Sequence, residues 1–480
     1  MLENASVTRS ESNLMWRLNL VAVFAAMIMV GRVALEEDLS WVAWTLVSVA
    51  VALLALIRWP YGALLVLAGC SAMPRFFVEI FGWKARPEHF AVGMIFLAVF
   101  VWVLRRKKFM VLQTTDYFII IYIICNYVSS AFSSPLPSAT LRWALMNNLA
   151  VLPYLLIRLL VQNMEALRKV FWLVLGVGFA ESCYGLLCYA SHYAFGTTTG
   201  MGIGYYLVDV AAPYGSLYEP NLFGAYTAFC AVLFLALYLV GEKQRRGFLI
   251  CYLVASLAAA LSLSRAALIA LVVASGWVFW RARRHETTHR SNLTFLVPVS
   301  ALILIMGVTV VGGVMRERFA DLFSQGLEEE TALARYVVIA EALKDIPNHP
   351  LLGTGTASLQ LSFEWTTYVP EWGNERAWIP NVIVRILHDT GLLGLSAFLA
   401  FVISLWLKIR QALRGRNSQL PMLVGLSAGA LLYSISFQST DGTILAFSWV
   451  HLGLLASAVT LLNGVGDSSS NTGRLPATSA

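Results

Sequence analysis

The chain has 480 residues, of which 58% are hydrophobic and only 13% are charged, and its mean hydropathy is +0.70. Soluble domains carry about 25% charged residues, so this composition excludes a soluble globular protein and indicates a polytopic membrane protein. The net charge is +7. The cations sit in short clusters beside apolar segments, a pattern typical of membrane topology signals and not of a nucleic-acid groove, so no nucleic-acid partner is expected.

The predicted fold is all-α, a transmembrane helical bundle. The polar segment 1–15 does not have the pattern of a cleaved signal peptide. A span needs about 20 apolar residues. About fourteen segments meet this need: 16–34, 40–57, 61–80, 89–104, 117–133, 143–161, 169–190, 221–240, 247–263, 265–280, 294–314, 380–407, 420–437 and 444–462. They divide into bundle parts 16–314 and 380–462, separated by one large loop, 315–379, between the eleventh and twelfth spans.

Positive clusters set the predicted topology. Each of the four strongest follows an even-numbered span: Arg105–Lys108, Lys243–Arg246, Arg281–Arg284 and Lys408–Arg410 with Arg414 and Arg416. Assigning that side to the cytoplasm places both termini inside and the loop 315–379 outside. Residues 1–15 then form a cytoplasmic N-terminus, and residues 463–480, rich in Gly, Ser, Asn and Thr, a disordered cytoplasmic tail.

The large loop is predicted to contain a helix. Thr331 can cap it, and Asn348 with Pro350 would stop it. Its apolar positions share one face: Leu333, Tyr336, Val337, Ala340 and Leu343. Such an amphipathic helix is expected to lie at the membrane interface and roof a cavity between the spans.

Arginines on the predicted outer side need an explanation, because the positive-inside pattern does not account for them. Arg265 lies where two apolar helices meet with no spacer. It is either a snorkelling side chain at a helix end or a ligand for an anion, since a guanidinium fork matches phosphate oxygens. Arg335, on the polar side of the loop helix, is either solvated or a second anion ligand. Arg142 opens the sixth span and is equally explained as a headgroup anchor.

Three polar residues share one face of the twelfth span. Asn381, Arg385 and His388 are spaced i, i+4, i+7, which points them toward a wet cavity. Asp389 follows Arg385 by four residues, so a structural ion pair is the alternative. His388 is a candidate proton acceptor, although many histidines are only hydrogen-bonded within a core.

Glu219, at the outer mouth of the eighth span, is a candidate general base, whereas its neighbour Asn221 is explained as a helix cap. The chain has no Walker A, HExxH or G-x-S-x-G motif and no cluster of metal-ligand residues. We therefore expect chemistry without a cofactor or metal that depends on arginine electrostatics.

Four segments, in order, resemble the O-antigen ligase and Wzy-type polysaccharide polymerase superfamily: Glu219–Ala225, Leu263–Ala267, Ala334-Arg335 leading to His349–Gly355, and Pro380-Asn381 running to Gly391-Leu-Leu-Gly394. The likeness covers roughly residues 215–400. It implies a membrane glycosyltransferase of the bacterial inner membrane whose active site faces the periplasm. The donor would be an oligosaccharide on undecaprenyl diphosphate.

By this likeness Arg265 and Arg335 would hold the diphosphate, with Arg142, Arg385 and Asn381 as further candidates. Glu219 and His388 are the candidate catalytic bases. Arg335 is expected to face Arg265 across an outer-leaflet cavity. Guanidinium groups would stabilise the negative charge that builds as the diphosphate departs, and a base would take the proton of the acceptor hydroxyl.

One departure separates the alternatives. The ligase branch has a His followed by Asn, Ser or Gln, nine further residues and Gly-x-x-Gly, and Pro380 occupies the His position here. This favours a polymerase for exopolysaccharide, capsule or O-antigen, with a chain-length regulator as a candidate partner. A ligase that transfers glycan to lipid A core or protein is the first alternative. A transporter of the same lipid is the second, but it would show two-fold repeats that are not visible here.

Overall fold

The computed structural model describes residues 61–75, 78–80, 83–89, 91–93, 95–96, 112–202, 211–241, 245–284, 330–363, 378–414 and 420–471. The predicted spans 16–34, 40–57 and 294–314, most of 89–104 and the segment 1–15 lie outside these residues. The chain divides into two compact units, residues 1–108 and 109–480, and each is described by itself.

The described part of the first unit contains helix α3 (Tyr61–Ser71) and an antiparallel hairpin of β1 (Val78–Ile80) and β2 (Trp83–Ala85). The predicted span 61–80 is therefore wrong in its second half. Pro74 follows the end of α3, and proline cannot continue a helical hydrogen-bond pattern. After the hairpin, Arg86 forms an ion pair with Glu88 at 3.1 Å.

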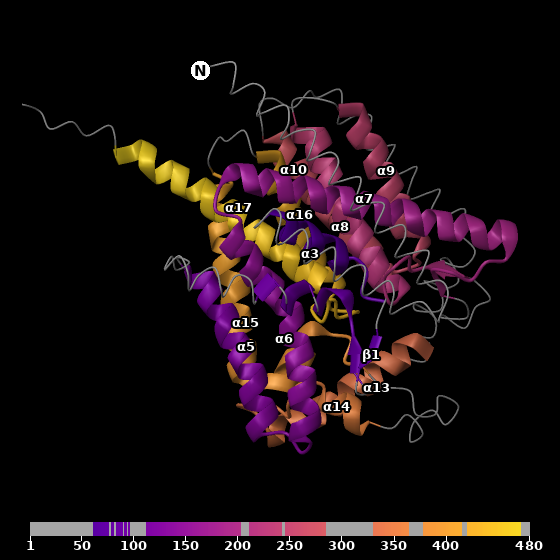
Figure 1. Ribbon diagram of the computed structural model, residues 1–480, viewed down its shortest axis with the longest axis vertical. Coiled ribbons are helices and arrows are strands. Elements are labelled where there is room, and N and C mark those ends of the chain that lie inside the picture. Colours follow the sequence, from indigo (N-terminus) through magenta and orange to yellow (C-terminus); the bar gives the residue numbers. More distant parts are fainter. Residues whose placement is uncertain are drawn as a thin grey trace, which may run out of the picture. The chain divides into compact units, whose positions relative to one another are not determined.

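The described part of the second unit is almost entirely helical: α5 (Thr114–Phe132), α6 (Pro137–Leu160), α7 (Met164–Phe195), α8 (Pro220–Val240), α9 (Arg245–Leu261), α10 (Arg265–Arg283), α13 (Glu330–Asp345), the 3-10 turn η3 (Ile346–Asn348), α14 (Ser358–Ser362), α15 (Val382–Ala412), α16 (Leu420–Ser436) and α17 (Ala446–Asn471), with one short hairpin, β3 (Met201–Gly202) and β4 (Ala212–Pro213). Figure 1 shows these elements.

Seven helices in the described residues are long and apolar enough to cross a membrane, and two shorter apolar helices, Arg246–Leu261 and Leu420–Ser436, accompany them. These nine helices confirm the predicted segments that begin at 117, 143, 169, 221, 247, 265, 380, 420 and 444. A multi-pass membrane protein is therefore supported, whereas the total of about fourteen spans stays a prediction. Helix α17 continues to Asn471, past the start of the predicted tail at 463, because helical hydrogen bonding does not require apolar residues.

Helix α8 forms the centre of the second unit, and its whole apolar window is buried. It packs on α9, α10 and α16. Gly429 of α16 has no room for a Cβ against Phe229 of α8, and Phe229 stacks on Tyr433 at 5.0 Å between ring centroids. Since Gly425 meets Leu233 farther along α8, the two helices are antiparallel, and the end of α16 lies near the start of α8.

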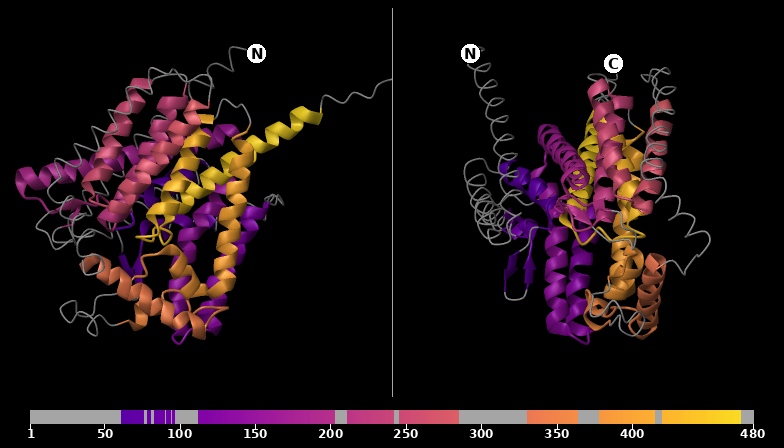
Figure 2. Two further views of the ribbon diagram at one scale, coloured as in Figure 1. Left: turned by 180° about the vertical axis from the view of Figure 1, so that it is seen from behind. Right: turned by 90° about the vertical axis from the view of Figure 1, so that its right-hand side faces the viewer.

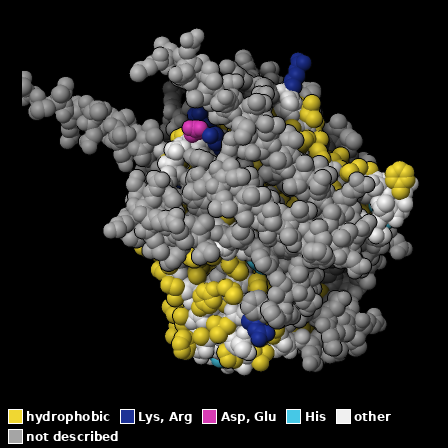
Figure 3. Space-filling view, in the orientation of Figure 1, with side chains coloured by type: hydrophobic (Ala, Val, Ile, Leu, Met, Phe, Trp, Pro, Cys, Tyr) yellow, Lys and Arg dark blue, Asp and Glu magenta, His cyan; other side chains and the backbone are white. Residues whose placement is uncertain are grey.

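Helices α5, α6 and α15 run side by side, with α13 and α14 at one end of them (Figures 1 and 2). At their other end Arg158 forms a buried ion pair with Asp116 at 3.1 Å, and the Tyr154 hydroxyl donates to the same carboxylate at 2.8 Å. The outer surface of α5 exposes Tyr117, Ile121, Ile124 and Phe132. Hydrophobic side chains gather over this part of the surface in Figure 3, as expected for a face toward lipid.

Helix α13 confirms the helix predicted in the large loop, and two residues of its predicted apolar face are exposed on the protein. Tyr336 and Leu343 are about half exposed, at 52% and 49%. The buried residues are instead Val338 and Ala342, which pack against Leu359 and Ile379. The side that is buried is set by partners distant in sequence, which the apolar spacing within the helix does not reveal.

Candidate functional site

Helix α15 is broken at Gly391, whose φ of 63° and ψ of −165° are not helical. The loop 350–355 supplies hydrogen bonds at the break. The amides of Thr354 and Gly355 donate to the carbonyls of His388 and Asp389 at 2.8 and 3.0 Å. Beyond the break, the amides of Leu392 and Leu393 donate to the carbonyls of Pro350 and Leu351. Two of the four sequence motifs, His349–Gly355 and Gly391–Gly394, are therefore joined by backbone hydrogen bonds. We call this contact between two motifs a joint.

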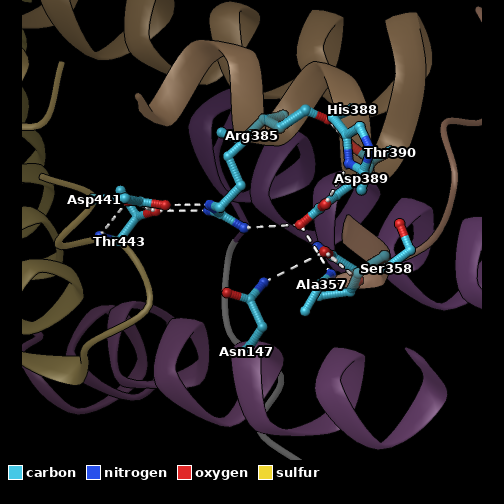
Figure 4. Close-up of polar contacts among 12 residues, drawn as sticks. Asn147, Ala357, Ser358, Arg385, His388, Asp389, Thr390, Asp441 and Thr443 are labelled. Atoms are coloured by element: carbon cyan, nitrogen blue, oxygen red, sulfur yellow. Dashed lines mark hydrogen bonds and ion pairs between the residues drawn. The ribbon is translucent and has the colours of Figure 1, made fainter. Parts of the chain in front are cut away.

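The N-terminal half of α15 carries a group of buried charges (Figure 4). The Arg385 guanidinium forms ion pairs with Asp441, in the loop after α16, and with Asp389 at 3.4 Å. It also donates to the Thr443 hydroxyl at 2.8 Å. With these partners inside the protein, the geometry favours a structural role for Arg385 over contact with a substrate.

His388 is almost completely buried and lies between two carboxylates. Its Nδ1 is 3.1 Å from Asp389 Oδ1, and its Nε2 is 3.4 Å from Asp345 Oδ2, at the end of α13. The Thr354 hydroxyl lies 3.2 Å from Nδ1. A neutral imidazole has one N–H, so both carboxylates are satisfied together only by the imidazolium form. In this arrangement the ring has no lone pair directed at a substrate.

Hydroxyl and amide groups extend this polar region into α5 and α6. Ser129 donates to the Asp389 carbonyl at 2.5 Å, and the Ser130 hydroxyl accepts from the Thr356 amide at 3.0 Å. Thr356 in turn donates to Asn126, which lies 3.4 Å from the Asn147 amide. Buried polar groups of this kind in apolar helices need mutual hydrogen bonds, and they hold the joint against α5.

The other two motifs, Glu219–Ala225 and Leu263–Ala267, also contact each other and form a second joint. A Cβ on Gly224 of α8 would lie 3.1 Å from the Cβ atoms of Ala267 and Ser264 and would collide with the Ser262 hydroxyl. Leu263, between α9 and α10, has a φ of 58°, and the Ser264 hydroxyl caps α10 by accepting from the Ala267 amide. The turn that carries Arg265 is therefore seated on the first turns of α8.

Both joints lie toward the same end of α16. The start of α8 is near the end of α16, and the Val382 amide at the start of α15 donates to the Phe437 carbonyl just after α16. Glu219, Arg265 and the charge group around Arg385 are thus carried by segments that meet one end of the bundle.

The predicted site residues take different places in the structure. Arg265 and Arg335 are half-buried, at the start of α10 and on α13, whereas Arg142 is exposed on α6. Trp143, next to Arg142, packs edge-on against Trp378 at 5.4 Å, which brings this turn of α6 to the entrance of α15. The arrangement of Arg335 opposite Arg265 stays a prediction.

Two other candidates stand at helix starts. Glu219, and not Asn221 as predicted, occupies the N-cap position of α8, and it is half-buried. Asn381 caps α15, where its side-chain oxygen accepts from the amides of Ile383 and Val384 at 3.0 Å and its amide donates to Gln438. This cap accounts for Asn381 without a substrate.

Sequence reasoning missed Asp345, Thr354, Asp441 and Glu181. Glu181 is buried in α7 and accepts from the Ser216 amide and hydroxyl, each at 2.8 Å, three residues before Glu219. A carboxylate in the middle of an apolar span was the signal for Glu181, because such residues are costly without a role. Asp345 and Asp441 gave no comparable signal, since both lie in polar segments.

The comparison with protein families agrees with the motif joints. Residues 249–399 match the family model described as O-antigen ligase (Wzy_C). The matched range contains Leu263–Ala267, the loop 349–355 and the broken first half of α15. No curated protein sequence matches the chain. The match over residues 249–399 supports the resemblance found in the motifs, and it leaves Glu219–Ala225 outside the matched range.

Proposed function

We propose that this protein is a membrane glycosyltransferase that joins repeat units carried on undecaprenyl diphosphate into a polysaccharide, at the periplasmic face of a bacterial inner membrane. The observation that carries the proposal is the position of the two motif joints, which place Glu219, Arg265 and the N-terminal half of α15 toward one end of the bundle. The buried Arg158–Asp116 pair at the other end has its partners inside the protein, so the gathering of the motif residues at one end favours an enzyme over a transporter, which needs a polar path to both faces.

The proposed reaction is a transfer between two lipid-linked molecules. A hydroxyl oxygen of the acceptor sugar attacks the anomeric carbon of the donor and forms the new glycosidic bond. The bond from that carbon to the diphosphate oxygen breaks, and undecaprenyl diphosphate leaves with the electron pair. The hydroxyl proton passes to a base, so charge and atoms balance.

Arg265 and Arg335 are proposed as the ligands of the departing diphosphate, with Arg142 as an outer contact. Both of the first two are half-buried, where a guanidinium stabilises an anion more strongly than in bulk water. The rigid seat of Arg265 on α8 supports its assignment, because a preorganised cation needs no rearrangement as charge develops.

Glu219 is the preferred candidate for the base. It is half-buried at the N-cap of α8, close in sequence to the loop that Glu181 holds. His388 is the weaker candidate, since both of its ring nitrogens face carboxylates. Arg385 and Asn381, with partners inside the protein, are proposed to shape the site and not to contact the diphosphate.

A ligase is the second candidate function, because the matched family model is described as O-antigen ligase. Against it, Pro380 stands where the ligase pattern has histidine, and Asn381 is engaged as a helix cap. The acceptor distinguishes the two. Deletion of a polymerase leaves single repeat units, whereas deletion of a ligase leaves long chains on undecaprenyl diphosphate.

The test combines this deletion with complementation by single variants at matched protein level. Arg265→Ala is expected to abolish polymer. Arg283→Ala, on the exposed opposite end of the same helix, is the control and should restore polymer as wild type does. Wild-type polymer with Arg265→Ala would refute the proposed diphosphate site. If long lipid-linked chains accumulate in the deletion strain, the protein is a ligase and the polymerase proposal is refuted.

A further inference from the structure

A row of alternating charges runs through the N-terminal half of α15 and joins two loops to it. In order it consists of Asp441, Arg385, Asp389, His388 and Asp345. The middle three residues belong to α15. The first belongs to the loop after α16, and the last is the final residue of α13. The row therefore fastens two separate polar segments to one broken helix.

The contact between Asp345 and His388, at the α13 end of the row, is favoured electrostatically. Asp345 is an acidic residue at a helix C-terminus, where the helix dipole disfavours negative charge and favours a cation. The His388 imidazolium, hydrogen-bonded to Asp389 on its other side, supplies that cation 3.4 Å away. Contact with His388 therefore offsets the unfavourable position of Asp345.

Few fully buried apolar side chains hold α13 against the bundle. In its described part these are Val338 and Ala342, against Leu359 and Ile379, with Ala334 and Val337 partly buried beside them. The loop 350–355 that follows is hydrogen-bonded to α15 at the break. Small buried side chains bury far less apolar area than a spanning helix does, so a polar contact between α13 itself and α15 adds to this docking.

We propose that Asp345 is a positioning residue that fastens α13 to α15 through His388 and thereby sets the position of Arg335. Arg335 lies ten residues earlier on the same helix, about 15 Å along its axis. A helix held at one end swings its other residues when that end is released. The consequence for Arg335 rests on the proposed function, whereas the fastening itself does not.

Hydrogen–deuterium exchange of the full-length protein in lipid nanodiscs tests the fastening. Asp345→Asn should speed exchange of the amides of 334–345 about fivefold, the effect expected for loss of one partly exposed charged contact. The side chain of Asp345 is 48% exposed, so this variant leaves the core intact. Exchange in α8 and α16 should not change and reports on the fold.

The matched control is Asp345→Glu at the same position. It keeps the negative charge that faces His388. It should leave exchange of α13 close to that of wild type. His388→Gln also removes the contact with Asp389, so it should speed exchange at least as much as Asp345→Asn does, and the double variant should not exceed His388→Gln alone. Unchanged exchange of α13 in Asp345→Asn would overturn the proposal.

Kinetics with a lipid-diphosphate-linked repeat unit test the consequence for Arg335. Asp345→Asn should raise KM for the donor about fivefold and change kcat less than twofold, because a displaced ligand weakens binding of ground and transition states alike. Asp345→Glu, which keeps the carboxylate, should recover most of the loss. If exchange of α13 is faster but KM is unchanged, Asp345 fastens α13 to α15 as proposed, and the claim that it sets the position of Arg335 is refuted.

Discussion

Gly353 and Gly391 meet so closely that a Cβ on either residue would lie 2.6 Å from the backbone nitrogen of the other. Both have positive φ, 71° and 63°. The contact joins the loop after α13 to the break in α15, and neither position leaves space for a side chain. The requirement for glycine in these two motifs is thus one of backbone packing.

Alanine at Gly391 should therefore destabilise the protein strongly. Its φ and ψ lie in a region that is essentially restricted to glycine, at a cost of about 1–3 kcal/mol, and overpacking adds about 1–3 kcal/mol. Thermal unfolding in detergent measures the change. Gly176→Ala in α7, where a Cβ meets nothing within 4 Å, is the control. Equal melting temperatures for the two variants would contradict the close contact.

The Arg385–Asp441 pair should behave as a buried ion pair. Removing one partner leaves an uncompensated charge, so Asp441→Asn and Arg385→Met should each cost about 3–5 kcal/mol. The double variant should cost less than the sum of the two, since neither charge then remains. Additive losses in the same unfolding assay would show that the two residues do not interact.

The joint at Gly224 offers a rescue experiment. Gly224→Ala should weaken the seat of the Arg265 turn and lower polymer output, because the added Cβ meets the Ser262 hydroxyl, Ala267 and Ser264. The nearest of these atoms is the hydroxyl, so Ser262→Gly in the same chain should recover part of the output. Polymer measured in cells at matched protein level decides the outcome. If Ser262→Gly does not raise the polymer output of Gly224→Ala, the collision with the Ser262 hydroxyl is not the cause of the loss.

Glu181 should hold the loop before Glu219 through its acceptor oxygens. Glu181→Gln keeps an acceptor for the Ser216 amide and should be mild. Glu181→Ala leaves that buried amide without its acceptor, at a cost of about 1–3 kcal/mol. Exchange protection of the amides of 211–219 is the measurement. Equal protection in the two variants would argue against this role.

The helices of the second unit could be predicted from sequence because their apolar runs are long, and lipid requires each to satisfy its own backbone. Other features depend on contacts that no local pattern contains. The pairing of Arg385 with Asp389 four residues later was one of the predicted alternatives, and the structure shows it. Its second partner, Asp441, lies 56 residues away and was not predictable.

The candidate site could be predicted only in part for the same reason, because its contacts join residues distant in sequence. Apolar spacing in α13 predicted a helix correctly, but its buried side depends on Leu359 and Ile379. The motif Gly391–Gly394 carried part of the family resemblance, yet the break at Gly391 depends on contacts with the loop 350–355. His388 was predicted as a proton acceptor from its residue type, and the two carboxylates around it became visible only once α13 and α15 were placed together.

The distance in sequence between Arg385 and Asp441 also sets an order of assembly in the membrane. When α15 first enters the bilayer, the chain that contains Asp441 has not yet been inserted. Until α16 has crossed and delivered it, Arg385 has only Asp389 to offset its charge. We therefore expect the first half of α15 to settle late, after α16, so that the proposed catalytic end is completed only when the last helices of the bundle are in place.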